Sequence, residues 1–353
     1  MANGRLLFVV TEVGAARFIE PLWKRWLERP PHFEWRVVAA DRAADHLRKT
    51  GLAEALPGFT AANTTDVELA GLGEWIPTAV AASAGDHYDI ELAAVRLARR
   101  LGAPSAQFID TWYNYRRRFD HAGGLTFPDT ILVIDKVALG EAAAEGLPRD
   151  ALEVVGQPAW EHVASLQPAP KQHVLFLGAP THRDYGMSLG YDEASAWQVV
   201  LEAAARHPDK IRRLMYGVHP AQGTIDADAV APAILTHDSV AALQQCGTVL
   251  GMFSSPMIDA YLGGRTVVSV QPNLRGQDRS PLSRHGRIAR VGDSEALVAA
   301  IERPPSASGS LMATLRGSTD RLDAWLCNFV GIARNAQPGK AGNDARMGTA
   351  VDE

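Results

Sequence analysis

Short apolar runs alternate with amphipathic segments along most of this chain, and this alternation limits the possible folds more than any other feature. Amphipathic segments at 18–29 and 89–102 predict helices in the first half of the chain. Strands that alternate with helices predict right-handed crossovers and a parallel sheet. The apolar runs of this half predict strands at 5–10, 34–40, 75–83, 104–110 and 130–136.

The alternation stops at 152–172, where a short strand runs into Gly156, Gln157 and Pro158, and then resumes. The second half predicts strands at 173–180, 210–220, 248–252 and 265–272, with helices between them. We therefore expect an α/β protein with two Rossmann-like domains that face each other across a cleft. The expected parts are an N-terminal domain at 1–157, a C-terminal domain at 158–312, a helix at 313–335 that packs back towards the first domain, and a disordered tail at 336–353.

The charge and cysteine content narrow the class of protein. The 353 residues carry a formal net charge of −5, which does not favour a nucleic acid or an anionic membrane as partner. Cys246 and Cys327 lie far apart and form neither a disulfide framework nor a metal-binding spacing. The apolar run near the N-terminus is too short for a transmembrane helix, and no signal peptide is predicted. We expect a cytoplasmic protein, and the sequence leaves its oligomeric state open.

Ligands of open parallel sheets bind outside the carboxyl ends of the strands, so the loops that follow strands are the candidate sites. The loop "FSSPMID" contains Ser254 and Ser255 before a helix. With Ser255 as N-cap and Pro256 at N1, the N3 position is Ile258, and the first turn has no carboxylate. Its free N–H groups and two hydroxyls would suit a phosphate, with Asp259 one turn further on. Helix capping alone is the competing explanation.

Two further loops of the second half could contact an anion. The segment "APTHRDYG" provides Thr181, His182 and Arg183, and a solvated loop is its competing interpretation. His219 ends the strand in "YGVHP" and could donate to a phosphate or balance charge on a leaving group. A proline that merely stops the strand is the competing explanation there.

In the first half, Asp110 follows a strand and is the candidate general base, with Glu12 as the second candidate carboxylate. Gly14 permits close backbone approach after the first strand. An aromatic and basic cluster follows Asp110 and could contact an acceptor. Its members are Trp112, Tyr113, Tyr115 and Arg116. A buried Asp–Arg pair with an aromatic cluster beneath a loop is the alternative.

Other polar residues of the first half carry weaker expectations. Ser83, Gly85 and Asp86 follow a predicted strand, whereas Asp89 and Glu91 are expected to be ordinary first-turn helix residues. The chain has no phosphate-binding P-loop, no G-x-S-x-G, no H-E-x-x-H and no Cys/His array. We therefore expect neither a metal ion nor another cofactor.

The order of these motifs resembles the two-domain glycosyltransferase superfamily called GT-B. The most similar groups are CDP-glycerol glycerophosphotransferases and non-hydrolysing UDP-N-acetylglucosamine 2-epimerases. "LEVVGQPAWEHV" resembles the V-x-G-N-P segment at the GT-B hinge, with Gln157 in place of Asn. "APTHRDYG" is similar to the epimerase T-x-H-R-R-E-N loop, from which Asp184 and Tyr185 depart, and "GVHP" matches a shared His-Pro.

"FSSPMIDAYLGGRTVVSV" resembles the donor-binding strand, loop and helix of these enzymes. There the helix start holds the diphosphate and an acidic residue one turn later holds the ribose, a role that the resemblance gives to Asp259. "FIDTWYNYRRRF" matches poorly the H-V-E-A-G-L-R-T segment of epimerases, and the W-H-G of glycerophosphotransferases is missing. Both departures favour another reaction.

The resemblance implies a metal-independent glycosyltransferase that uses a nucleotide-sugar donor, such as a UDP-sugar, with a glycan, lipid-linked or small-molecule acceptor. Cell-surface polysaccharide or glycoconjugate biosynthesis is the expected setting. Closure about the Gln157–Pro158 hinge would exclude water from the donor. Two alternatives stay open: a sugar-nucleotide epimerase or hydrolase on the same fold, and a degenerate, non-catalytic GT-B subunit.

Overall fold

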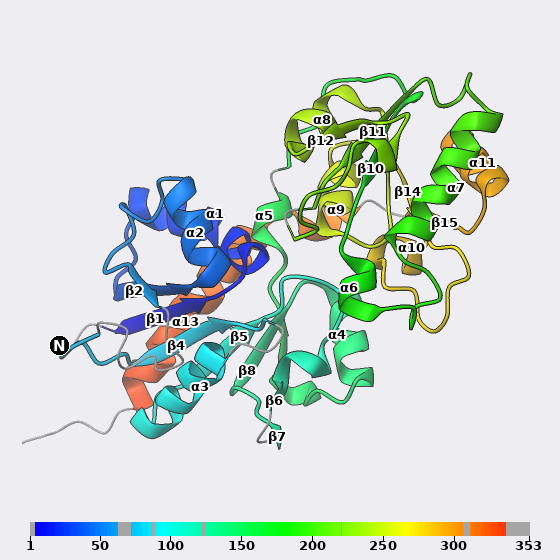
Figure 1. Cartoon of the computed structure of the whole chain (residues 1–353). Coiled ribbons are helices and arrows are strands. Elements are labelled where there is room, and N and C mark those ends of the chain that lie inside the picture. Colours follow the sequence, from blue (N-terminus) through cyan, green and yellow to red (C-terminus); the bar gives the residue numbers. More distant parts are fainter. Residues whose placement is uncertain are drawn as a thin grey trace, which may run out of the picture. The chain divides into compact units, whose positions relative to one another are not determined.

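The structure, a computed structural model, describes residues 4–62, 72–85, 89–121, 124–161, 163–219, 221–305 and 311–336 (Figure 1). Two compact units make up the chain: Met1–Pro158 with Gly317–Glu353, and Ala159–Arg316. We call them the N-terminal unit and the C-terminal unit. The predicted disordered tail lies, from residue 337 on, outside the described residues, and so does Asp86.

The N-terminal unit has a parallel sheet of seven strands in the order β3-β2-β1-β4-β5-β8-β9. Their bounds are β1 Arg5–Val10, β2 Glu34–Ala40, β3 Thr60–Ala62, β4 Ala79–Ser83, β5 Ser105–Phe108, β8 Thr130–Val133 and β9 Leu152–Val154. A small antiparallel pair, β6 (Asp120–His121) and β7 (Gly124–Leu125), lies in the connection after β5.

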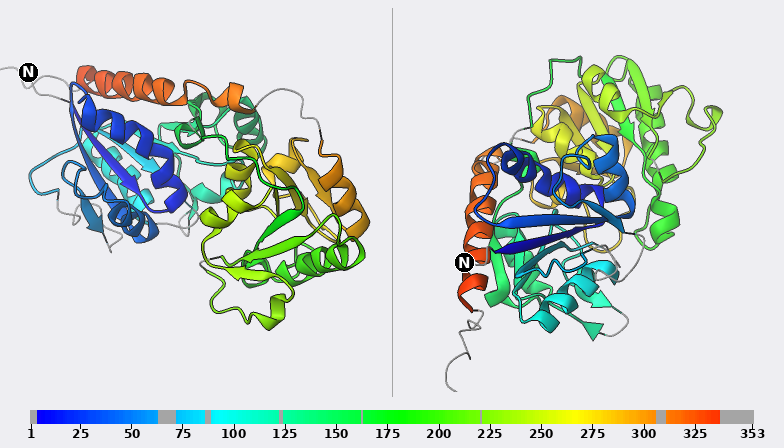
Figure 2. Two further views of the ribbon diagram at one scale, coloured as in Figure 1. Left: turned by 90° about the horizontal axis from the view of Figure 1, so that it is seen from above. Right: turned by 90° about the vertical axis from the view of Figure 1, so that its left-hand side faces the viewer.

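Helices cover both faces of this sheet. They are α1 Val13–Glu28, α2 Asp41–Lys49, α3 Asp89–Leu101, α4 Lys136–Ala144 and α13 Ser318–Ala336, with short 3-10 turns η1 Arg116–Phe119 and η2 Arg149–Ala151. Because strand side chains alternate between faces, Leu6 and Phe8 of β1 pack in one core and Leu7 and Val9 in the other. The predicted return of the C-terminal helix is confirmed, since Leu322 and Leu326 of α13 belong to the first of these cores. Figure 2 shows α13 in red beside the blue elements of this unit.

The C-terminal unit has a second parallel sheet, with the order β12-β11-β10-β13-β14-β15. Its strands are β10 His173–Leu177, β11 Arg213–Gly217, β12 Ile234–Thr236, β13 Thr248–Gly251, β14 Thr266–Val270 and β15 Ala289–Val291. Its helices are α6 Thr181–Tyr185, α7 Glu193–Arg206, α8 Ser239–Gln245, α9 Ser255–Leu262, α10 Pro281–Arg284, α11 Ser294–Glu302 and α12 Leu311–Leu315, with η3 Asp228–Val230. The four-residue helix α5 (Pro158–Glu161) lies at the boundary between the units.

The predicted fold class, two parallel α/β sheets with helices, is confirmed. Some boundaries differ from the prediction. The first helix begins at Val13, five residues before the predicted start, because Gly14, Ala15 and Ala16 form its first turn rather than a loop. The strand predicted from residue 75 begins at Ala79. None of the helices in the described part of the chain is long and apolar enough to cross a membrane.

Candidate functional site

Three loops of the C-terminal unit leave the carboxyl ends of neighbouring strands. β10 lies between β11 and β13, with Leu177 opposite Gly217 and Phe176 opposite Leu250. The three loops are therefore side by side at one edge of the sheet. They provide the predicted anion-binding residues, which are Thr181, His182, Arg183, His219, Ser254 and Ser255.

The two serines follow β13, and the predicted register of their helix is wrong by one residue. α9 begins at Ser255, so Ser254 is the N-cap, Pro256 occupies N2, and Met257 occupies N3. The side chain of Ser254 makes no capping hydrogen bond. Its Oγ is buried and has no hydrogen-bond partner in the described part of the chain. Capping therefore does not explain Ser254, and the first turn of α9 has no acidic residue to complement its dipole.

Hydrogen bonds hold the strand end that precedes these serines. The buried Thr181 directs its Oγ1 to Sδ of Met252 at 3.4 Å, which connects the loop after β10 to the end of β13. The carbonyl of Met252 accepts from Oγ of Ser269 at 2.5 Å and from Nε2 of Gln271 at 3.3 Å. Both donors are buried on β14 and just after it, so the strand end that leads into the serine turn is held by β14.

His219 follows β11 in a turn that defines its tautomer. Its ring Nδ1 accepts from the backbone N–H of Ala221 at 3.1 Å. The backbone N–H of His219 donates to Oε1 of Gln222 at 2.8 Å. A neutral imidazole whose Nδ1 accepts carries its proton on Nε2. We assign this tautomer from the hydrogen bond, and it makes Nε2 a donor.

His182 and Arg183 lie in a short helix, α6, where the sequence predicted a loop. The guanidinium of Arg183 is exposed and donates through Nε to Oδ1 of Asp184 at 2.7 Å, and this hydrogen bond raises its pKa. Its Nη1 donates to the carbonyl of Ala221 at 2.8 Å, so Arg183 connects the loops after β10 and β11. Nδ1 of the exposed His182 lies 3.4 Å from Oδ2 of Asp192.

Asp259 lies four residues after Ser255 on α9, so the two side chains are on the same face of the helix. It is half-buried. Asp259 therefore lies one turn after the helix start, as the sequence predicted, although the N-cap is Ser254 and not Ser255.

Asp110 follows β5 in the N-terminal unit and lies against the start of α1. Its Oδ2 occupies the space next to Cα of Gly14, in the first turn of that helix. Oδ1 lies 3.5 Å from Nη1 of the buried Arg118, and the backbone carbonyl of Asp110 accepts from Nε2 of Gln157 at 2.8 Å. Because the first turn of α1 contains no acidic residue, Asp110 provides the negative charge that complements its dipole.

The alternative interpretation of this segment, a buried Asp–Arg pair, is therefore partly correct, because Asp110 and Arg118 form an ion pair. Arg118 also donates to the carbonyl of Ala84 and lies over the ring of Tyr113, 5.8 Å from its centroid. Asp110 nevertheless remains accessible to solvent, since its side chain is 20% exposed whereas that of Arg118 is 8% exposed. It can be a structural partner of Arg118 and still reach a ligand.

Two members of the aromatic cluster are buried and pack in the protein interior. Trp112 and Tyr115 are each 1% exposed, and they donate to Oδ2 of Asp135 and Oε2 of Glu141 at 3.1 and 2.9 Å. Their rings offer no open face for an acceptor to stack on, contrary to our expectation. Tyr113 is half-buried and Arg116 is exposed. Glu12 is the N-cap of α1, although its side chain makes no capping bond.

Glu91 is the buried carboxylate that the sequence interpretation missed. It lies on α3 and is 2% exposed. It accepts from Oγ1 of Thr11 and from the backbone N–H of Gly85, both at 2.6 Å, and from the hydroxyl of Ser83. Burial raises its pKa to about 7, against the lowering effect of these donors. The polar residues Thr11 and Ser83, each at the end of an apolar strand, were the signal that a buried partner was needed.

Comparison with known proteins identifies the fold. No protein-family model matches the chain, and no curated protein matches its sequence. Among solved structures, UDP-GlcNAc 2-epimerase from Methanocaldococcus jannaschii has a TM-score of 0.65 at 11% identity, over 92% of this chain and 99% of that one. The enzyme from Neisseria meningitidis, bound to UDP-GlcNAc, has a TM-score of 0.65 at 10% identity, over 92% and 100%.

A glycosyltransferase from Rickettsia africae matches with a TM-score of 0.53 at 9% identity, over 94% of each chain. At these identities the likeness concerns the fold. The protein therefore has the two-domain GT-B fold, and the predicted resemblance is confirmed at the level of the fold. Within the described residues, no group of three His, Cys, Asp or Glu side chains is placed to hold a metal ion.

Proposed function

We propose that this protein is a glycosyltransferase that uses a nucleoside-diphosphate sugar as donor. The observation that carries the proposal is the buried hydroxyl of Ser254, which has no hydrogen-bond partner among the described residues at a helix start without its own carboxylate. A buried hydroxyl without a partner is costly, and a phosphate oxygen would satisfy it. The diphosphate of the donor fits this position, because an anion also complements the α9 dipole.

In this proposal, the C-terminal unit stabilises the charge that builds on the leaving diphosphate. The donors are the hydroxyl of Ser254, the backbone N–H of Ser255 at the start of α9 and the Nε2–H of His219. Donors fixed before the reaction need no reorganisation as charge develops, and Met252 with its partners on β14 provides that rigidity. Asp259 would bind the ribose, and Arg183, which borders the same loops, would add positive charge. The proposal requires no metal ion.

The acceptor chemistry is assigned to the N-terminal unit. Asp110 would accept the proton of the attacking hydroxyl from its position beside the start of α1 and Arg118. Its side chain is partly exposed, as a base that meets a substrate must be. Glu12 is the reserve base, and Tyr113 and Arg116 are the acceptor contacts that remain after the burial of Trp112 and Tyr115.

A sugar-nucleotide 2-epimerase is the second candidate. The observation that favours it is the high TM-score of two solved UDP-GlcNAc 2-epimerases, one of them bound to UDP-GlcNAc. An epimerase would use the same diphosphate site of the C-terminal unit. It would differ in needing no acceptor.

The test separates donor binding from reaction type. A thermal-shift panel of UDP-, GDP-, CDP- and dTDP-sugars should contain at least one stabilising donor, and a ligand at one hundred times its dissociation constant adds about 2.7 kcal/mol. No shift with any donor would overturn the proposed site. The stabilising donor is then incubated alone and with hydroxyl acceptors. Consumption only with an acceptor supports the transferase, whereas a C2 epimer formed without acceptor identifies the epimerase.

A further inference from the structure

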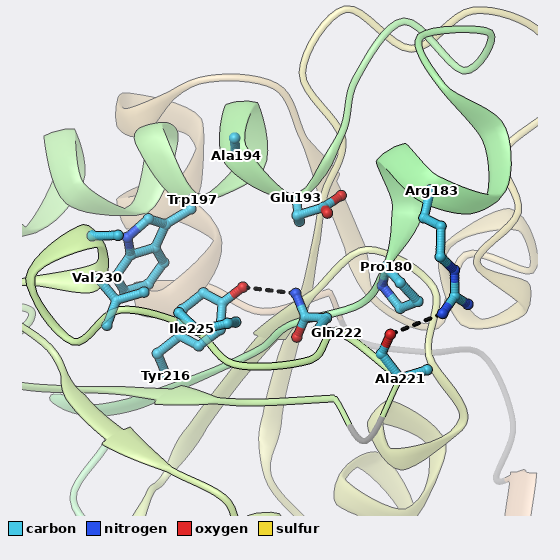
Figure 3. A pocket seen from close by; sticks show the side chains of 11 residues that line it. Pro180, Arg183, Glu193, Ala194, Trp197, Tyr216, Ala221, Gln222, Ile225 and Val230 are labelled. Carbon is cyan, nitrogen blue, oxygen red and sulfur yellow. Dashed lines mark hydrogen bonds between the residues drawn. The ribbon is translucent and has the colours of Figure 1, made fainter.

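A cavity of about 290 Å³ lies within the C-terminal unit (Figure 3). Its walls come from Pro180 and Arg183 at and within α6, from α7, from β11 and from the segment at 221–230. No residue of α9 lines it, and neither does His219. Of the residues assigned to the proposed diphosphate site, a ligand in this cavity would therefore share only Arg183.

One end of the cavity is apolar. Trp197 and Tyr216 are 6% and 3% exposed, and their rings meet edge to face with centroids 5.0 Å apart. Ile225 and Val230 lie beside them in Figure 3. Behind them, Phe176 packs on both aromatic rings, so this wall is rigid. Such a wall accepts an aromatic or branched aliphatic group without having to rearrange.

The other end carries two opposite charges. Figure 3 shows Glu193 and Arg183 on the side away from Trp197 and Val230. Oε2 of Glu193 accepts from the backbone N–H of His182 at 2.8 Å, while its Oε1 has no hydrogen-bond partner among the described residues. Arg183 uses Nε and Nη1 for Asp184 and Ala221, and its Nη2 makes no hydrogen bond in the same part of the chain. One acceptor and one donor are thus left for a ligand.

We propose that this cavity binds a zwitterionic α-amino acid with an aromatic or branched aliphatic side chain. The ammonium group pairs with Oε1 of Glu193 and the carboxylate with Nη2 of Arg183, both as charge-assisted hydrogen bonds. The side chain packs on Trp197 and Tyr216. The volume, just below the range of about 300–1,000 Å³ for small-molecule sites, suits a single small molecule. Glu193 disfavours an anion without a cationic group, which excludes a free phosphate.

The ligand test is isothermal titration calorimetry on the full chain with L-phenylalanine and L-leucine. At least one of them should bind, and three analogues should each bind about tenfold or more weakly. N-acetyl-L-phenylalanine lacks the ammonium group, phenethylamine lacks the carboxylate, and glycine lacks the side chain. No binding of either amino acid at millimolar concentration, or equal binding of N-acetyl-L-phenylalanine, would overturn the proposal.

Two variants locate the binding in this cavity. Ala194 is exposed on α7 and lines the cavity, so Ala194→Phe should fill it and abolish binding without removing any core contact. Ala205→Phe, at an exposed position of the same helix outside the cavity, is the control and should bind as the wild type does. Glu193→Gln should weaken binding about tenfold, and Glu202→Gln should not. Wild-type affinity in Ala194→Phe would contradict the assignment whatever its thermal stability.

Discussion

The carboxylate of Asp110 occupies the space that a side chain on Gly14 would fill. This contact joins the end of β5 to the first turn of α1, two segments that are far apart in sequence. This contact explains why position 14 is a glycine. Gly14 does not have a left-handed conformation. It lies inside helix α1, where alanine would otherwise be preferred. Gly14 is there because a carboxylate needs the room.

Gly14→Ala should therefore impair activity more than stability. The added methyl group would displace the carboxylate from the helix start and from Arg118, and a displacement of about 1 Å can lower the rate about 100-fold. The rate of donor consumption measures this. Gly140→Ala is the control, because no described atom beyond its chain neighbours and its own helix backbone lies within 4 Å of the added group, and it should add about 0.5–1 kcal/mol of stability with unchanged activity. Equal rates in both variants would refute the role of Gly14.

The raised pKa of Glu91 predicts how the free energy of unfolding depends on pH. Its folded pKa of about 7 lies above the ordinary value of 4.5, so the unfolded chain releases this proton first as pH rises. The contribution of Glu91 is therefore complete below about pH 4.5 and is lost as pH rises through about 7, by about 3 kcal/mol in total. Urea unfolding at pH 5 and pH 8 should show a smaller loss in Glu91→Gln than in the wild type.

Asp89→Asn is the matched control for Glu91, because Asp89 is an exposed acid at the start of the same helix. It should retain the pH dependence of the wild type. If Glu91→Gln and Asp89→Asn had the same pH slope, the buried carboxylate would not be the group that titrates.

The return of α13 to the N-terminal unit makes a prediction about stability. Leu326 is 1% exposed in the core that also contains Leu6 and Phe8, so Leu326→Ala should cost about 2–5 kcal/mol. Asn328→Ala, on the exposed side of the same helix, should change stability by less than about 0.5 kcal/mol. Chemical denaturation of both variants measures the difference. A loss of less than about 1 kcal/mol in Leu326→Ala would mean that α13 contributes little to this core.

The fold could be predicted because buried parallel strands are continuous apolar runs that local sequence reveals. Leu6 to Val10 and Val174 to Leu177 are examples, each buried on both faces of its sheet. The strands of the two large sheets that the sequence did not predict, β3, β12 and β15, have three residues each and lie at a sheet edge. Such short runs do not differ from loops in composition, and only pairing with a neighbour makes them strands.

The site could be predicted less well, because its geometry depends on contacts between distant segments. Two adjacent serines before a proline allow either serine to be the N-cap, and only the packed backbone selects Ser254. Glu91 lies in the first turn of α3, as predicted, but its burial could not be predicted because its partners Thr11 and Ser83 come from distant segments. The positions of Arg183 and His219 after β10 and β11 followed from topology alone, whereas their partners Ala221 and Gln222 did not.

Ser254→Ala tests the central claim most directly, with Ser255→Ala beside it. Because Oγ of Ser254 is buried without a hydrogen-bond partner among the described residues, its removal should not destabilise the ligand-free fold and should raise the free energy of unfolding by about 1–3 kcal/mol. Calorimetric titration with the stabilising nucleotide sugar should nevertheless show about tenfold weaker binding in Ser254→Ala. Ser255→Ala retains its backbone N–H and has an exposed side chain, so its affinity should change less. Unchanged affinity in Ser254→Ala would contradict the proposal that this serine holds the diphosphate.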